Sequence, residues 1–356
     1  MTRLYSNLHS PRTQTRKRAE SFAAAQDSGL DFYRDRRVLV TGGLGFIGSN
    51  LAIALSELGA AVTVVDAQVP GCGWRPENLD PVRDRVVYVH ADMADARRIR
   101  PLLEGQRVIF NLAGEISHIN SMTNPPRDLA INCEAQLRFL DLCRTVNPGA
   151  TIVYASSRQV YGRPKYLPVD EAHPVHPVDY NGVHNHAAEH YHFLLRQQFQ
   201  MRTLCLRLGN TYGPRLGIHQ ECRGFIDTFV RKALQGEQIV VFGDGRQLRG
   251  MTYVDDVVDA FLRAGQAGPA AAAVYNVDHP KAVSLWEIAE TLSRVAGSPP
   301  PRLVAFPPER LVIDIGDYCP NPEKFCREFG WTPRVGLEEG LRRTIAFFRS
   351  GRPVSA

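Results

Sequence analysis

The chain is poor in lysine, and several features that define protein classes are missing from it. Only five of its 42 lysine and arginine residues are lysines. The arginines are dispersed and no basic run is interleaved with aromatic residues, so the net charge of +5 does not indicate a nucleic-acid site. No stretch approaches the roughly 18 apolar residues of a membrane helix, and no charged-then-apolar secretory signal opens the chain. We therefore expect neither a nucleic acid nor a membrane as partner.

Paired cysteine motifs are also absent. The seven cysteines are scattered, without a CxxC pair: Cys72, Cys133, Cys143, Cys205, Cys222, Cys319 and Cys326. An odd, unpatterned set favours reduced thiols in a cytoplasm-like compartment, most of them serving as small core residues.

The order of apolar segments predicts the fold class. Residues 1–36 are polar and without a clear period, which indicates a flexible tail or docking arm. From Arg37 onward, buried strands such as VLVTG, AVTVVDA and TIVYASS alternate with helical segments. This alternation predicts an α/β fold with a doubly wound parallel sheet. We expect the cofactor domain over 37–212 plus about 251–280, and a smaller discontinuous domain over 213–250 and 281–350.

A glycine-rich turn marks the expected cofactor site. TGGLGFIG places Gly42, Gly45 and Gly48 directly between a strand and a helix, and Asp66 ends the next strand. Small residues let the backbone approach a pyrophosphate at the helix N-terminus, where free N–H groups favour an anion. A carboxylate at Asp66 accepts hydrogen bonds from ribose hydroxyls and repels a 2′-phosphate, so NAD is favoured over NADP.

Two later strands end at further positions where a cofactor would lie. The third strand ends in HADM, where Asp92 could reach the adenine. The alternative, that Asp92 caps a helix N-terminus, is nearly as good an interpretation. NLAG ends the fourth strand with small residues. The predicted cofactor-binding residues are Gly42, Gly45, Phe46, Ile47, Gly48, Asp66, Asp92, Met93, Leu112, Ala113 and Gly114.

With these motifs in order, the chain resembles the extended short-chain dehydrogenase/reductase family, and within it the NAD-dependent nucleotide-sugar epimerases and dehydratases. The resemblance runs from about Arg37 to the C-terminal helix and includes INCEAQ, SSRQVYG, LRLGNTYGPR, FGDGRQLRGMTYVDD and GWTPRVGLEEGL. It implies a Rossmann domain that holds NAD and a smaller domain for a nucleoside diphosphate sugar. It also implies a homodimer that buries part of the helix following the expected active-site tyrosine.

Carried over by position, the resemblance assigns several substrate contacts. Ser157 matches the active-site hydroxyl, Asn210 a substrate contact, and Arg249 the arginine that clamps the diphosphate, which suits a bidentate guanidinium. Dehydratases of the family carry Asp-Glu after the active-site serine or threonine. Here Arg158 and Gln159 stand in those places, and neither supplies a proton-transfer carboxylate, so dehydration is disfavoured.

The family's tyrosine and lysine are spaced YxxxK, but DYNGVHNHAAEHYH (residues 179–192) has no lysine. One register places Tyr180 and His184 at these positions, and a protonated histidine could stabilise a phenolate. The ungapped register, anchored on Glu189, places Asn181 and Asn185 there instead, and amides do not titrate in this range. We favour the ungapped register for the alignment. Of the two registers, however, only the first supplies a titratable pair, Tyr180 and His184. The predicted catalytic residues are therefore Ser157, Tyr180 and His184.

Other polar residues are candidates for binding or for proton transfer. His118 and Glu115 in GEISHINS are spare acid/base candidates. The same stretch contains His184, His186, His190 and His192. No acidic or cysteine ligand stands at helpful spacing, so no metal is expected; the plain alternative is an exposed polar helix face. The predicted substrate-binding residues are His118, Asn181, Asn210 and Arg249.

These features favour an NAD-dependent nucleotide-sugar epimerase that oxidises a sugar hydroxyl transiently. Two alternatives stay open. One is a catalytically degenerate NAD-binding partner or regulatory subunit, which the Asn register motivates. The other is an enzyme of the same fold acting on a non-sugar substrate in specialised metabolism, with His184 or His118 as base.

Overall fold

The computed structural model describes residues 30–219, 224–307 and 314–350. Residues 1–29 of the predicted tail and Cys222 lie outside these ranges. A short 3-10 helix, η2 (Leu30–Tyr33), precedes the first strand, and the Tyr33 hydroxyl donates a hydrogen bond of 2.6 Å to the Leu262 carbonyl. Tyr33 is fully buried, so the packed chain begins before Arg37.

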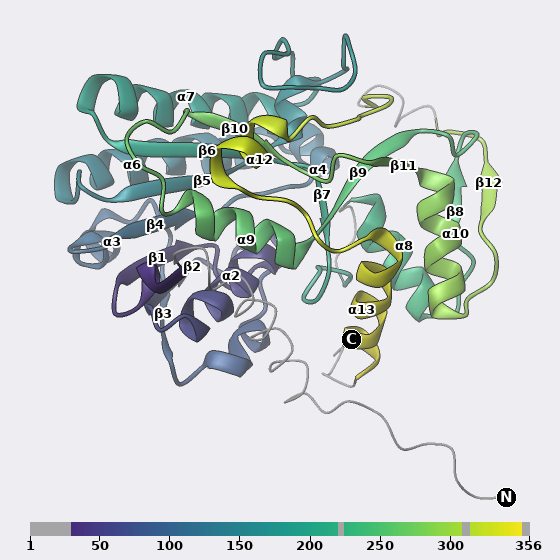
Figure 1. Ribbon diagram of the computed structural model, residues 1–356, viewed down its shortest axis with the longest axis horizontal. Helices are drawn as coiled ribbons and strands as arrows, with labels where there is room; N and C mark the ends of the chain where they lie inside the picture. Colours follow the sequence, from purple (N-terminus) through teal and green to yellow (C-terminus); the bar gives the residue numbers. More distant parts are fainter. Residues whose placement is uncertain (1–29, 220–223, 308–313, 351–356) are drawn as a thin grey trace, which may run out of the picture.

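A seven-stranded sheet forms the larger layer, and all of its neighbouring strands are parallel (Figure 1). Its strands, in spatial order, are β10 (Val274–Val277), β6 (Arg202–Leu208), β5 (Thr151–Ser157), β4 (Val108–Asn111), β1 (Arg37–Thr41), β2 (Ala61–Asp66) and β3 (Val86–His90). In β1, Val38 and Val40 pack into one hydrophobic cluster and Leu39 into another. A parallel strand buried on both faces explains why these segments are continuous apolar runs.

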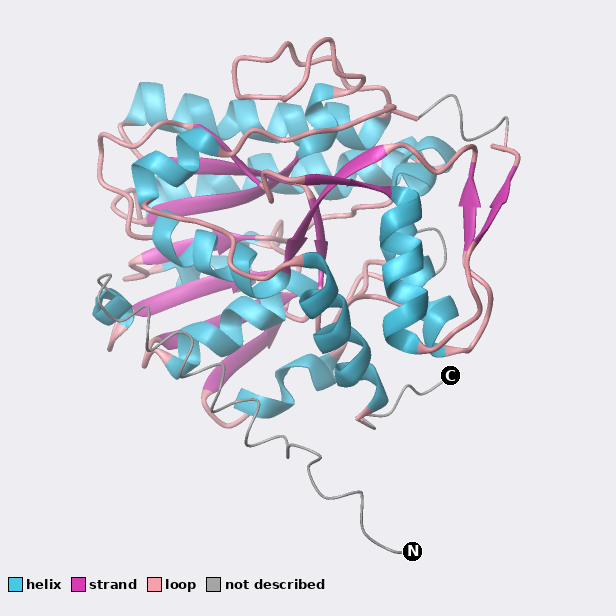
Figure 2. Cartoon of the chain, turned by 45° about the vertical axis from the view of Figure 1, so that its right-hand side comes forward, coloured by secondary structure: helices cyan, strands magenta, loops and turns pink. Residues whose placement is uncertain are grey.

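Helices cover both faces of this sheet (Figure 2). The cluster that contains Val38 and Val40 includes α2 (Phe46–Glu57) and α9 (Val254–Ala264). The cluster that contains Leu39 includes α3 (Ala96–Leu103), α6 (Ala135–Val146) and part of α7 (Tyr180–Phe199). The predicted doubly wound α/β fold is therefore confirmed.

Short helical elements lie between the strands, and one follows the last strand. They are η3 (Pro76–Val82), α4 (His118–Thr123), α5 (Pro125–Leu129), the π-helical turn η4 (Ala130–Glu134), η5 (Arg158–Tyr161) and α12 (Glu323–Phe329). None of the helices within the described ranges is long and apolar enough to cross a bilayer.

A smaller layer lies beside the large sheet and has its own hydrophobic cluster. It contains the sheet β11 (Ala282–Ser284), β9 (Leu248–Tyr253), β7 (Asn210–Tyr212), the pair β12 (Arg302–Val304) and β8 (Val240–Phe242), and the helices α8 (Phe225–Leu234), α10 (Leu285–Ala296) and α13 (Leu337–Arg349). Its segments are interrupted by α9 and β10, which belong to the large layer. The exact domain bounds given by the sequence stay a prediction.

Candidate active site

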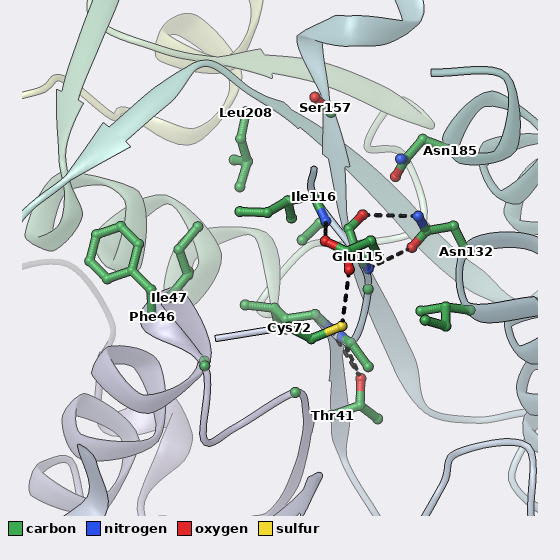
Figure 3. Close-up of a pocket in the computed structure, with 18 of the residues that line it drawn as sticks. Thr41, Phe46, Ile47, Cys72, Glu115, Ile116, Asn132, Ser157, Asn185 and Leu208 are labelled. Carbon is green, nitrogen blue, oxygen red and sulfur yellow. Dashed lines mark hydrogen bonds between the residues drawn. The ribbon is translucent and has the colours of Figure 1, made fainter. Parts of the chain in front are cut away.

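A cavity of about 400 Å³ opens at the carboxyl ends of the parallel strands, between the two layers. This is the edge at which ligands bind in open α/β sheets. It is lined by all eleven predicted cofactor-binding residues, and also by His118, Ser157, Asn181 and Asn210. Tyr180, His184 and Arg249 are not among its lining residues. Figure 3 shows Ser157 and Asn185 lying across the cavity from Phe46 and Ile47.

The glycine turn packs too closely for side chains. Gly42 has a φ of +66°, and a Cβ added to Gly48 would lie 2.3 Å from the Gly42 carbonyl oxygen. The first turn of α2 contains no acidic residue, and no side chain caps its N-terminus. The backbone N–H groups at the start of α2 are thus available to an anion such as a pyrophosphate.

Asp66 lies beside this turn and lines the cavity. Its Oδ2 accepts a hydrogen bond of 3.1 Å from the Leu44 N–H, and its Oδ1 accepts one of 2.9 Å from the Gln68 N–H. Burial raises the pKa of this carboxyl, and the two backbone hydrogen bonds act against that rise. The carboxylate is held in place and keeps lone pairs for ribose hydroxyls, so the site fits NAD.

Ser157 stands at the end of β5, on the opposite side of the cavity. Its Oγ accepts a hydrogen bond of 3.2 Å from the Gln159 N–H and so caps η5. The capping role leaves the hydroxyl proton free for another acceptor, since a hydroxyl both donates and accepts. Its predicted contact with the reacting sugar oxygen is sterically open, because Ser157 lines the cavity.

Asn181 and Asn185 occupy the cavity wall in place of a titratable pair. The Asn181 amide donates to the Glu115 carbonyl oxygen and to Asp128 Oδ2, at 2.7 and 3.1 Å. The Asn185 amide donates to Asn181, and the Tyr154 hydroxyl donates a bond of 2.8 Å to Asn185 Oδ1. The arrangement corresponds to the ungapped register. Neither of these two amides exchanges a proton near neutral pH.

Neither Tyr180 nor His184 lines the cavity, so the structure does not support the prediction of a catalytic pair there. Tyr180 is 44% exposed. His184 is buried, but its Nδ1 lies 2.6 Å from Asp128 Oδ1. The reason is helical geometry: Glu189, Asn185 and Asn181 are spaced by four and share the buried face of α7. Tyr180 is about 100° away around the axis.

A histidine–carboxylate pair reaches the cavity from elsewhere. His118 begins α4, and its Nδ1 lies 2.8 Å from Asp179 Oδ2. Asp179 is buried and caps α7, accepting a 2.7 Å bond from the Gly182 N–H. Burial would raise the pKa of Asp179, but the hydrogen bond and charge of His118, with the Gly182 N–H and Arg158, lower it. The carboxylate is therefore ionised, which favours a proton on His118 Nδ1.

The other ring nitrogen of His118 faces an amide. His118 Nε2 lies 2.5 Å from Gln159 Nε2. An amide N–H can only donate, so this contact requires a lone pair on His118 Nε2. With the proton on Nδ1 toward Asp179, Nε2 is the accepting nitrogen of the ring, and in this arrangement it accepts from the Gln159 amide. Asp179 was missed by the sequence reasoning, although an aspartate just before a helix is a visible N-cap signal.

Glu115 is the other spare acid/base candidate, but both of its carboxylate oxygens already accept hydrogen bonds within the protein. Its Oε1 accepts hydrogen bonds of 3.0 Å from the N–H groups of Ile116 and Ser117. Its Oε2 accepts a bond of 3.4 Å from the Cys72 thiol, as Figure 3 shows. Burial and the nearby Glu115 charge raise the pKa of Cys72 to about 12, so its thiol stays protonated. We interpret Glu115 as a residue that shapes the loop before α4.

Arg249 contacts Asp314 and Gly316 and does not line the cavity. Its Nη1 donates to the carbonyls of Leu248 and Gly316, at 2.8 and 2.6 Å. Its Nη2 donates to Gln247 and lies 3.8 Å from Asp314. The predicted diphosphate clamp is therefore not formed in this arrangement, because the guanidinium is used to tie β9 to the C-terminal segment.

The histidines of α7 are only partly the exposed polar face that the plain alternative predicts. His184 and His192 are buried, and His192 stacks on Tyr154 with ring centroids 4.6 Å apart. Burial lowers the pKa of His192 to about 4, so its ring is neutral. His186 and His190 contact each other at 3.2 Å. Within the described ranges, no group of three or more histidine, cysteine, aspartate or glutamate side chains could hold a metal ion.

The cavity combines a glycine turn, the acid at the end of β2 and a serine at the end of β5. A comparison with known families agrees with this arrangement. A model described as the NAD dependent epimerase/dehydratase family matches residues 38–278. The chain belongs to this family. The sequence-based assignment to the extended short-chain dehydrogenase/reductases is confirmed, as is NAD as the family's cofactor.

Relatives of this family member match it over most of their length. A UDP-glucose 4-epimerase from Mycolicibacterium smegmatis is 34% identical over 324 residues, covering 88% of this chain and 99% of that protein. The Thermotoga maritima UDP-glucose 4-epimerase, solved with UDP-glucose, has a TM-score of 0.80 at 29% identity and covers 88% of this chain and 99% of that one. The Thermus thermophilus UDP-glucose 4-epimerase, solved with NAD, has a TM-score of 0.77 at 29% identity, with the same coverage.

Proposed function

We propose that this family member is an NAD-dependent nucleotide-sugar epimerase that oxidises a sugar hydroxyl transiently and restores it with inverted configuration. The single observation that carries this proposal is the cavity itself, where the cofactor-binding turn, Ser157 and a histidine base face one space. Similarity to UDP-glucose 4-epimerases over 88% of the chain supports a nucleoside diphosphate sugar as substrate. NAD, when bound, supplies the acceptor and donor of the hydride.

Proton transfer falls to His118 in this proposal. Its Nε2 accepts the proton of the reacting sugar hydroxyl, and Asp179 stabilises the imidazolium that results. The Ser157 hydroxyl donates to the same sugar oxygen. On return, the proton moves from His118 Nε2 to the alkoxide. Asn181 and Asn185 hold the wall of the cavity and exchange no proton.

The test is incubation of the purified, NAD-loaded chain with a panel of nucleotide sugars. We expect an epimerised product from at least one of them, detected by chromatography and by NMR of the anomeric proton. A transient reduced-cofactor absorbance is expected with the same substrate. No product and no reduced cofactor with any member of the panel would contradict the proposal and favour a silent NAD-binding partner.

We further infer that the enzyme is a homodimer built on the α5–α6 and α7 face. Leu129, Leu137, Val183 and Leu194 are large apolar residues exposed on these helices. The helices pack side by side, with Cys133 and Tyr191 in contact at 3.3 Å. A second copy of the same face would remove this apolar surface from water.

Replacement of Leu137 and Leu194 by glutamate is expected to convert the dimer into a monomer, since each change places a charge in the apolar contact. Light scattering after size exclusion measures the mass. The matched control is Leu303→Glu, an equally exposed leucine on β12, which should leave the mass unchanged. A wild-type monomer, or a double variant that stays dimeric, would contradict this interface.

A reducing, cytoplasm-like compartment is part of the same proposal. Cysteines 72, 133, 143, 205, 319 and 326 are all free thiols. Free, partly or fully buried thiols in a packed domain are typical of proteins kept reduced.

A further inference from the structure

Arg158 is a buried cation at the cavity for which the proposed chemistry has no use. It follows Ser157 directly, is 9% exposed and lines the cavity. Its Nη2 donates a bond of 3.3 Å to Asn210 Oδ1, and its guanidinium lies 5.1 Å from the centre of the Tyr318 ring. Asn210 and Tyr318 thus hold the guanidinium plane in place.

The other end of this guanidinium has no partner. Arg158 Nη1 is buried without a hydrogen bond, and no carboxylate of the described residues lies within ion-pair distance of Arg158. Burial lowers the pKa of Arg158, as expected for a cation withdrawn from water. Leaving a buried donor of a charged group without a hydrogen-bond partner is energetically costly. Such a group indicates a missing anionic ligand.

The nearby acids are engaged elsewhere. Asp179 holds His118 and the Gly182 N–H. Asp278 accepts bonds of 2.8 Å from the Thr252 hydroxyl and the His279 N–H, and burial raises its pKa to about 7. It is therefore not a fixed negative charge at neutral pH. The charges of Asp179, Asp278 and Asp314 act on Arg158 from a distance, but none of these carboxylates forms an ion pair with it.

We propose that Arg158 binds a carboxylate carried by the sugar ring, so that the substrate is a nucleoside diphosphate sugar acid. This inference rests on the proposed epimerase function. Ser157, Arg158 and Gln159 are consecutive and all line the cavity, and Gln159 contacts His118, so the Arg158 side chain lies beside the reacting end of the cavity. A ring substituent reaches that end together with the reacting hydroxyl. A planar guanidinium matches the two oxygens of a carboxylate better than any neutral hydroxymethyl group.

The test compares UDP-glucuronic acid with UDP-glucose, which differ only in the carboxylate at C6. Both are titrated calorimetrically into the NAD-loaded full chain. We expect tighter binding of the acid, on the order of 10- to 100-fold, from hydrogen bonds to a charged group. Arg158→Met should abolish this preference and change the Kd for UDP-glucose little. Arg158→Lys should keep part of it, because the charge remains and the fork is lost.

Arg100→Met is the matched control, because it removes one exposed arginine from α3 and should leave the preference intact. Absence of a preference in the wild-type chain, including no binding of either ligand, overturns the proposal even if Arg158→Met does not fold. Equal weakening of both ligands in Arg158→Met also overturns it, since that result places Arg158 on the diphosphate. Epimerisation of UDP-glucose without a preference would leave the proposed function standing. A preference for UDP-glucuronic acid without turnover of either sugar would support the role of Arg158 and contradict the proposed epimerase function.

Discussion

Replacement of His118 by alanine is expected to reduce turnover by about 10²- to 10⁴-fold, the usual contribution of a positioned acid/base group. NAD binding should be unchanged, because His118 does not contact the glycine turn or Asp66. The physical reason is that His118 lines the cavity and its Nδ1 is paired with the buried Asp179, so Nε2 is the nitrogen that takes the proton once the sugar hydroxyl displaces the Gln159 amide. Steady-state rates on the substrate found in the panel, with equilibrium binding of NAD measured separately, check both parts.

Two companion measurements separate chemistry from folding. Free imidazole should restore part of the activity of His118→Ala by occupying the space left by the ring. His190→Ala, which removes the exposed member of the histidine pair on α7, should retain full activity. Normal turnover in His118→Ala would show that the proton is transferred elsewhere and would remove His118 from the proposed site.

The variant Asp179→Asn tests whether Asp179 positions His118 in the histidine–carboxylate pair. Asparagine is as good an N-cap as aspartate, so α7 should form normally. The amide does not carry the charge that stabilises an imidazolium on His118. We expect a lower kcat with little change in KM, and no rescue by imidazole, because His118 still occupies the space.

Most of the fold could be predicted because each strand of the large sheet is a local signal. The runs around Val38, Val64 and Ile152 are mostly apolar, and glycines or polar residues end them. The cofactor end of the cavity follows for the same reason. The turn at residues 42–48 and the acid at Asp66 are joined by a short strand–helix–strand unit, so their spatial relation is fixed by local sequence.

The reacting end was predicted only in part, because it is assembled from distant segments. The predicted residues Ser157, His118, Asn181 and Asn210 line the cavity. The pairing of His118 with Asp179 and the place of Arg249 were not predicted. His118 and Asp179 are 61 residues apart, and no periodicity links them. The predicted diphosphate clamp at Arg249 is not formed for a similar reason. Its position in RQLRGMTYVDD indicates a clamp, yet its donors are used by the Gly316 carbonyl, 67 residues further on. Neither contact leaves a pattern in a single sequence.

The register of α7 was open in the sequence, and a buried ion pair explains how the fold decides it. Glu189 accepts hydrogen bonds from Arg207 Nε and Nη2, at 2.8 and 2.7 Å, and from the Ser156 hydroxyl at 2.6 Å. Both charged side chains are almost completely buried. This contact fixes the rotation of α7, and Asn185 and Asn181 follow on the same face.

Replacement of Glu189 by alanine is therefore expected to lower the free energy of unfolding by about 3–5 kcal/mol, because Arg207 is left as an uncompensated buried charge. Urea unfolding of the NAD-saturated protein at neutral pH measures the loss. The matched control is Glu338→Ala, which breaks an exposed pair with Arg294 and should change stability little. Equal unfolding midpoints for the two variants would show that the Glu189 pair does not hold the helix.

The same carboxylate gives a stability change of defined sign at low pH. Burial alone would raise the pKa of Glu189, but the hydrogen bonds and charge of Arg207, with those of His186 and Ser156, lower it from 4.5 to about 2. A depressed pKa contributes stability that is complete above pH 4.5 and is lost as the pH falls toward 2. Glu189→Gln carries no titrating group there, so the difference in unfolding free energy between wild type and variant should shrink over this window. A difference that stays constant from pH 5 to about 2 would mean that the charge of Glu189 does not fix α7. The placement of Asn181 and Asn185 at the cavity would then need another cause.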